Sequence, residues 1–178
     1  LTDGPLQHCD RFHEAYVPMA GGVIVWVCSI YAYDSNQTDS EELTSALINA
    51  VLLRADELPP GPKVIGVDLN CGIADCPGAQ QALRCGWHDA LALGAAMRGE
   101  DTPATYINRV ASTTIDTVLV NNLAMPFFLE CNVRTFNMPG HRGVGALFAF
   151  PHVEPVALQL VTPKPLPSGP PGSMALVQ

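Results

Sequence analysis

The chain has 178 residues, of which 48% are hydrophobic and 15% charged, so it fits one folded domain and is not a disordered chain. Its formal net charge of −8 argues against a broad sequence-independent grip on nucleic acid, although a bound divalent cation can reverse the local field. No apolar run approaches the roughly 20 residues that span a bilayer, so we expect a soluble protein without a membrane partner.

The first part of the chain predicts a hairpin of strands followed by a helix. One strand begins at Phe12, and the next covers Gly22–Tyr31. Apolar residues then recur at helical spacing and predict a helix over Ser40–Glu57 that packs on a sheet. Thr38 or Ser40 is expected to cap this helix, because a side-chain oxygen there can accept a hydrogen bond from a free N–H group.

The rest of the chain alternates further strand and helix signals before it ends in a tail rich in proline, glycine and serine. The predicted elements are a strand over Val64–Leu69, helices over Ala79–Arg84 and Asp89–Met97, an exposed loop over Gly99–Asn108, and strands over Thr114–Val120, Leu129–Phe136, Val144–Phe150 and Val153–Val161. This order predicts a mixed α/β domain over residues 1–161, with helices outside sheets that are not all parallel, and a disordered tail over 162–178.

The cysteines are scattered and lack the paired spacing of a zinc finger, so we expect reduced and mostly buried thiols. They stand at positions 9, 28, 71, 76, 85 and 131. A metal site or a disulfide within Cys71, Cys76 and Cys85 is the open alternative. No signal peptide is visible, which favours an intracellular protein, cytoplasmic or nuclear. The start at Leu1 rather than methionine favours a fragment or processed product, with further domains in a longer parent chain.

Two polar side chains stand at and just after the end of the strand that begins at Val64. In open α/β sheets, ligands bind beyond the carboxyl ends of strands. Asp68 and Asn70 would therefore face a crevice, while Val67 and Leu69 pack below them. The alternative, equally supported by this stretch alone, is that the polar residues merely turn the chain or cap the next helix.

Two further polar residues belong to later strands, Asp116 within one and His141 directly before another. Burying an unpaired carboxylate costs several kcal/mol, so Asp116 is expected to have a partner. An imidazole needs such a partner to be held in one state, and we expect Asp116 and His141 to lie within hydrogen-bond reach. The alternative for His141 is an ordinary loop residue.

Six short motifs then occur in an order typical of one family. They cover Trp26–Ala32, Val64–Asn70, Gly86–Ala90, Ala104–Tyr106, Ser112–Leu119 and Pro139–Val144. Together they resemble the endonuclease/exonuclease/phosphatase superfamily, which includes pancreatic deoxyribonuclease, apurinic/apyrimidinic endonucleases, retroelement endonucleases and inositol-phosphate phosphatases. The resemblance covers about residues 12 to 160 and implies a four-layer α/β sandwich of two mixed sheets flanked by helices.

The resemblance also implies a metal-dependent phosphoester hydrolase, most simply a nucleic-acid phosphodiesterase, that uses Mg²⁺ or Mn²⁺ with Asp68 as a metal ligand. By position, Asp68 would orient or deprotonate the attacking water and Asn70 would bind a phosphate oxygen. Tyr31 would line the phosphate pocket. His141 would stabilise charge in the transition state, and Asp116 would accept a hydrogen bond from its other ring nitrogen.

Two departures from the family pattern bear on activity. Gly140 stands where the closing loop of the family carries an aspartate, and the Asn and Glu motifs of the family's first part have no match here. We therefore expect a partial or degenerate hydrolase. The alternative is a catalytically inactive relic or interaction module that uses an exposed sheet edge. A third hypothesis makes Cys71 a nucleophile beside Asp68 and His141, although no oxyanion-hole glycine pattern accompanies it.

Overall fold

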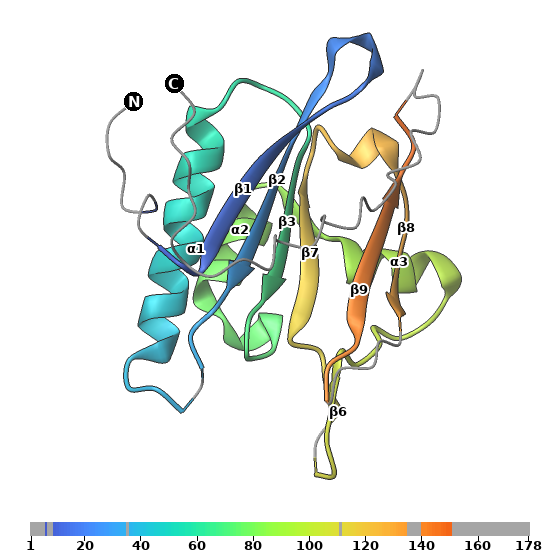
Figure 1. The fold of residues 1–178 in the computed structure, drawn as a ribbon. Helices are drawn as coiled ribbons and strands as arrows, with labels where there is room; N and C mark the ends of the chain where they lie inside the picture. The colour runs from blue at the N-terminus through green and yellow to red at the C-terminus, as the bar shows by residue number, and fades with distance from the viewer. Residues whose placement is uncertain (1–5, 7–8, 35, 111, 135–139, 151–178) are drawn as a thin grey trace, which may run out of the picture.

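The computed structural model describes residues 6, 9–34, 36–110, 112–134 and 140–150 (Figure 1). Its strands are β1 (Phe12–Pro18), β2 (Ile24–Tyr31), β3 (Lys63–Asp68), β4 (Trp87–Asp89), β5 (Tyr106–Ile107), β6 (Ser112–Thr113), β7 (Asp116–Asn121), β8 (Phe128–Arg134) and β9 (Gly143–Phe148). Its α-helices are α1 (Ser40–Glu57), α2 (Pro77–Arg84) and α3 (Ala90–Arg98). The predicted strand over Val153–Val161 and the predicted tail lie outside the described residues.

Five strands form a mixed sheet in the order β1-β2-β3-β7-β4. The β1–β2 pair is antiparallel, as predicted, whereas β2 and β3 run parallel and β7 is antiparallel to β3 and β4. One face of this sheet packs against α1 and α2, where Trp26, Ile48 and Ile65 are buried in one cluster. The parallel pair arises because α1 carries the chain back across the sheet between β2 and β3.

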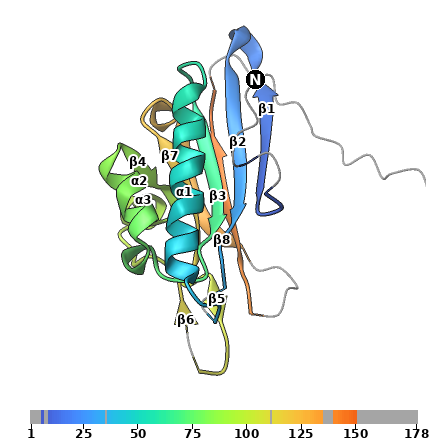
Figure 2. The same cartoon turned by 90° about the vertical axis from the view of Figure 1, so that its left-hand side faces the viewer.

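The strands β8 and β9 form a separate antiparallel sheet on the side of the first sheet away from α1 (Figure 2). Val118 and Val120 of β7 join Cys131 of β8 and the half-buried Val144 of β9 in a second apolar cluster. The mixed-sheet α/β architecture predicted from the sequence is therefore confirmed, with β8 and β9 as the described part of the second sheet. None of the helices in the described part of the chain is long and apolar enough to cross a membrane.

The predicted cap of α1 is wrong, although the bounds of the helix are as predicted. Asp39, in a left-handed conformation with φ of 62°, precedes the helix, and its side chain accepts no hydrogen bond from the first turn. The first turn instead carries Glu41 and Glu42, whose charges favour the positive end of the helix dipole. The local sequence therefore determines where the helix begins, whereas the conformation of the preceding segment at Asp39 determines how the helix is capped.

The predicted exposed loop over Gly99–Asn108 is wrong in its last part. Thr105 is completely buried, and Tyr106–Ile107 pairs with Ser112–Thr113. The hydroxyl of Thr105 accepts hydrogen bonds from the backbone N–H groups of two residues at the start of β7, which no periodic pattern reveals. All six cysteines are free: three are buried, two are half-buried and Cys85 is exposed.

Candidate active site

The register of the first sheet places three candidate residues side by side. Asp68, the last residue of β3, lies opposite Asp116, the first residue of β7, and on its other side lies opposite Tyr31 of β2. Because directly opposed residues point to the same face of a sheet, the two carboxylates face one another at this sheet end. Like charges so placed repel each other unless a cation or a proton lies between them.

His141 comes to the same sheet end through the short strand β5. It forms an isolated bridge with Tyr106, and the two rings meet edge to face with centroids 5.0 Å apart. The carbonyl oxygen of Thr105 accepts a hydrogen bond of 2.6 Å from the N–H group of Arg142. Thr105 thus holds the start of β7 through its hydroxyl and the His141 loop through its carbonyl. The sequence motif around Tyr106 marked this region, but the positioning role of Thr105 was not predicted.

The imidazole and the carboxylate that we expected to meet do lie together. Nδ1 of His141 is 3.5 Å from Oδ2 of Asp116, an ion pair only when the histidine is protonated. That carboxylate oxygen is buried and has no hydrogen-bond partner within the described parts of the chain. Burying a carboxylate oxygen without a partner is unfavourable in free energy, so a cation beside Oδ2 of Asp116 would stabilise the folded site.

One ligand atom from each of Asp68, Asp116 and His141 can be chosen so that all three lie within 4.8 Å of one another. Carboxylate oxygens are the ligands that Mg²⁺ and Mn²⁺ prefer, and Mn²⁺ also accepts imidazole nitrogen. The unpartnered Oδ2 of Asp116 is the atom that such a cation would satisfy. The residues present therefore fit a divalent cation.

Burial raises the pKa of Asp68 above its ordinary value of 3.8. The hydrogen bond from the N–H group of Asn70, 3.0 Å long, opposes this rise, Asp116 adds to it, and His141 lowers it again. Folding without a metal therefore disfavours the ionised form of Asp68. This cost is absent below the unfolded pKa, where the carboxyl is protonated in both states; it grows as the pH rises from the unfolded to the folded pKa and is constant above that.

We therefore expect Asp68→Asn to raise the thermal unfolding midpoint at pH 7 in EDTA, because the amide removes the buried charge. The gain should vanish as the pH falls below about 3.8, where the wild-type carboxyl is protonated in the folded and unfolded states. Scanning calorimetry of both proteins from pH 3 to 8 measures this difference. A variant less stable than the wild type at pH 7 would contradict it.

Asn70 lies beside Asp68 in a left-handed conformation with φ of 55°. Its backbone N–H donates to Oδ1 of Asp68, and its side-chain amide donates to the carbonyl oxygen of Ala32 at 3.1 Å. The turn that we gave as the alternative interpretation of Asp68 and Asn70 is thus present. Asn70 forms this turn and also lies at the candidate site. One hydrogen of the Asn70 amide remains for a ligand.

Tyr31 is 51% exposed at the rim of the site. The guanidinium of Arg11 lies 5.2 Å from the centre of its ring and donates a hydrogen bond of 2.8 Å to the carbonyl oxygen of Ala32. Arg11 thus brings a positive charge to the site edge, and it was missed because it lies in a stretch without periodicity. Burial raises the pKa of the Cys71 thiol to about 11, which opposes its use as a nucleophile near neutral pH.

No protein-family model matches the sequence, and no curated protein matches it. Solved structures do match. The Neisseria 3′ phosphatase NExo, solved with a product DNA hairpin, is 15% identical with a TM-score of 0.60 over 79% of this chain and 71% of that chain. An AP endonuclease from Archaeoglobus fulgidus is 14% identical with a TM-score of 0.61 over 83% and 68%. The endonuclease domain of a telomere-specific non-LTR retrotransposon is 11% identical with a TM-score of 0.59 over 79% and 64%.

These neighbours are nucleases and phosphatases of one superfamily, the same that the sequence motifs resemble. They match along more of this chain than of their own length. At such low identities the likeness concerns the fold. The chain has the fold of the endonuclease/exonuclease/phosphatase superfamily.

Proposed function

We propose that the chain is a metal-dependent phosphoester hydrolase acting on nucleic-acid phosphodiesters. The observation that carries the proposal is the buried, unpartnered Oδ2 of Asp116 inside the group formed with Asp68 and His141. The solved neighbours support the substrate class, since one of them is bound to product DNA and another is an AP endonuclease. Mg²⁺ or Mn²⁺ is the cofactor that we assign to the carboxylates of Asp68 and Asp116, beside His141.

In this mechanism Asp68 accepts a proton from the attacking water, because its carboxylate lies at the open end of β3. His141 turns Nδ1 toward Asp116, which fixes its orientation and leaves Nε2 to donate to a phosphoryl oxygen. The free hydrogen of the Asn70 amide binds a second phosphoryl oxygen, and Tyr31 borders the phosphate. The cation, when bound, neutralises charge on the phosphoryl oxygens.

The metal is expected to bind saturably in calorimetry and to raise the thermal unfolding midpoint as its concentration rises. At one hundred times the dissociation constant the stabilisation is about 2.7 kcal/mol for a ligand that binds only the folded state. Asp116→Asn should lose both effects, because the buried oxygen no longer carries charge. Asp56→Asn, the same change at an exposed position of α1, is the matched control and should keep them.

The wild type, Asp116→Asn and Asp56→Asn are then assayed, with the metal and with EDTA, for nicking of plasmid and abasic DNA. Nicking that requires the metal and Asp116 supports the hydrolase. Metal binding that Asp116→Asn leaves unchanged contradicts the assigned site, and nicking that survives EDTA contradicts metal dependence.

A second candidate function, an inactive interaction module, is favoured by the Gly140 position and the sheet edges. Gly140 has φ of +84°, and a Cβ there would lie 2.8 Å from Cε2 of Tyr106, so this position excludes the aspartate of the family pattern without strain. Among the described residues, β1 pairs only with β2 and β9 only with β8, which leaves the other edge of each strand open to a partner. A folded chain that neither binds metal nor nicks DNA supports this function.

A further inference from the structure

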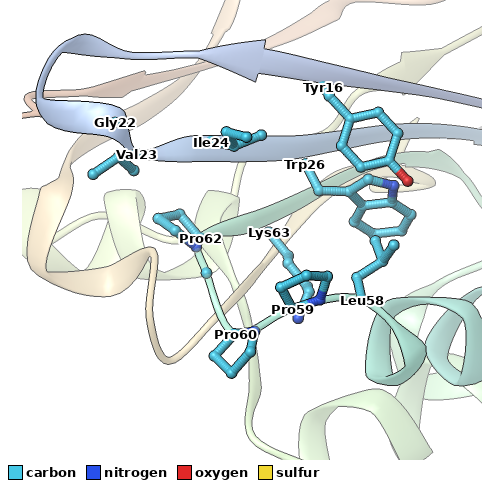
Figure 3. Close-up of a pocket in the computed structure, with 11 residues that line it drawn as sticks. Tyr16, Gly22, Val23, Ile24, Trp26, Leu58, Pro59, Pro60, Pro62 and Lys63 are labelled. Carbon is cyan, nitrogen blue, oxygen red and sulfur yellow. The ribbon is translucent and has the colours of Figure 1, made fainter.

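A hollow lies beside Lys63, at the end of β3 away from Asp68, and Figure 3 shows the residues that line it. Its volume is about 490 Å³, within the range of small-molecule sites. Trp26 and Tyr16 line one side, and the turn that follows α1, from Leu58 to Pro62, lines the other. Lys63, the first residue of β3, completes the lining.

Lys63 is the exceptional residue of this cavity. Its exposed fraction is only 8%, yet its ammonium has no hydrogen-bond or ion-pair partner among the residues that the structure describes. Lysine is rarely buried unless its charge is paired. The register pairs Lys63 with Trp26, so the two side chains share the face of the sheet that α1 covers. Lys63 lines the cavity, and its ammonium is not among the fully buried side-chain atoms.

Two acidic groups that lie next to lining residues, Glu14 and Glu57, are already engaged. Glu14 accepts hydrogen bonds from the indole N–H of Trp26 at 2.8 Å and from Arg54 at 3.0 Å. Arg54 in turn bonds the hydroxyl of Tyr16 at 3.1 Å and lies 3.8 Å from a carboxylate oxygen of Glu57. Both carboxylates therefore engage Arg54, and among the described residues neither one contacts the ammonium of Lys63.

The cavity wall opposite Trp26 is rigid. Prolines at positions 59, 60 and 62 fix three backbone φ angles of the turn. The side chain of Asn121 donates to the carbonyl oxygen of Gly61 at 2.9 Å and accepts from the N–H group of Lys63 at 3.0 Å. The N–H group of Trp26 donates to the carbonyl oxygen of Pro62. A wall held in place before a ligand arrives lowers the entropy cost of binding.

We propose that this cavity is a binding site for a small carboxylate that carries an apolar chain. The carboxylate pairs with the ammonium of Lys63, and the apolar chain covers the Trp26 indole and the proline rings. A charge-assisted hydrogen bond in a partly buried site is stronger than one in water, whereas an uncharged ligand would leave the ammonium unpaired. The site is separate from the proposed hydrolase centre, since Lys63 and Asp68 stand at opposite ends of one strand.

The test uses octanoate, octanol and octylamine as probes, which share one chain and differ in charge. Isothermal calorimetry and tryptophan fluorescence of the full chain should show saturable octanoate binding with a dissociation constant of about 1 mM or lower. Octanol and octylamine should bind at least about tenfold more weakly, the difference expected from one charge-assisted hydrogen bond. Octanol binding as tight as octanoate, or no saturable octanoate binding, overturns the proposal.

The matched variants are Lys63→Met, which keeps an apolar stem of similar length, and Lys164→Met, the same change at the other lysine of the chain. Lys63→Met should weaken octanoate binding at least about tenfold and leave octanol binding unchanged. Lys63→Arg should restore most of the octanoate affinity. Equal octanoate binding by the wild type and Lys63→Met overturns the proposal. Metal-dependent nicking is expected to be the same in all three variants, which separates this result from the hydrolase assay.

Discussion

Asp68→Asn is expected to lower metal-dependent nicking of abasic plasmid DNA by about 10²–10⁴-fold, the usual cost of losing a positioned acid or base. The amide has the shape of the carboxylate, and its oxygen can still accept the hydrogen bond from the N–H group of Asn70. The local turn is therefore kept while the charge and the proton acceptor are lost. Because the same variant is expected to be more stable than the wild type at pH 7 in EDTA, loss of folding would not explain its inactivity.

Asp34→Asn is the matched control for this experiment. Oδ1 of Asp34 accepts a hydrogen bond from the N–H group of Asn36 at 3.0 Å, the same kind of turn as that between Asp68 and Asn70, but at an exposed position. Its nicking rate should equal that of the wild type. A wild-type rate in Asp68→Asn would refute the assigned role of Asp68.

An inactive wild-type chain would instead support the interaction module. In that case Gly140→Asp alone should not restore nicking. The new side chain would meet the Tyr106 ring from a backbone with positive φ, and the glutamate of the family's first part would still have no counterpart in the chain.

Gly94→Ala is expected to have the largest effect on stability, a loss of about 3 kcal/mol or more in the free energy of unfolding. A Cβ at this position of α3 would collide with the carbonyl oxygen of Cys131 and lie 2.9 Å from its backbone nitrogen. Cys131 is in the middle of β8, where the backbone is paired with β9 and cannot move aside as the end of a flexible side chain could. The helix and the second sheet would have to separate and would open the apolar cluster that contains Leu91 and Val118.

Gly66→Ala is the control substitution for Gly94→Ala. A Cβ at Gly66 in β3 would lie 3.9 Å from the nearest atom beyond its chain neighbours, the carbonyl oxygen of Cys28. The change should be neutral or stabilising by up to about 1 kcal/mol, since alanine is favoured over glycine inside strands. Urea denaturation followed by circular dichroism measures both variants. Similar midpoints for the two would contradict the close packing inferred at α3.

The parts of the fold that rest on local signals were predicted well from the sequence. The helix over Ser40–Glu57 has the predicted bounds, because its apolar spacing is helical over five turns and a proline pair follows it. The hairpin of β1 and β2 was also predicted, because a glycine turn joins two apolar stretches. Cap geometry and the pairing of β5 with β6 were not, because both depend on contacts with segments elsewhere in the chain.

Some features of the candidate site could likewise be predicted from the sequence, and others only from the structure. The sequence alone determined which polar residues stand at strand ends and loops, namely Asp68, Asn70, Asp116 and His141, because hydrophobic periodicity marks where strands begin and end. Tertiary structure decided which of them meet. The register of β3 against β7, strands 48 positions apart at Asp68 and Asp116, opposes the two carboxylates, and β5 brings in His141.

Tertiary structure also produced three features whose roles the sequence did not predict. Thr105 became a buried residue that holds two backbone segments by hydrogen bonds, Arg11 came to the edge of the site, and Lys63 was buried with no partner for its ammonium among the described residues. Each depends on pairing between segments that are distant in the chain. The physical reason is that a side chain's type and neighbours in sequence fix its local conformation, whereas its burial, its charge partner and its function arise from packing between elements.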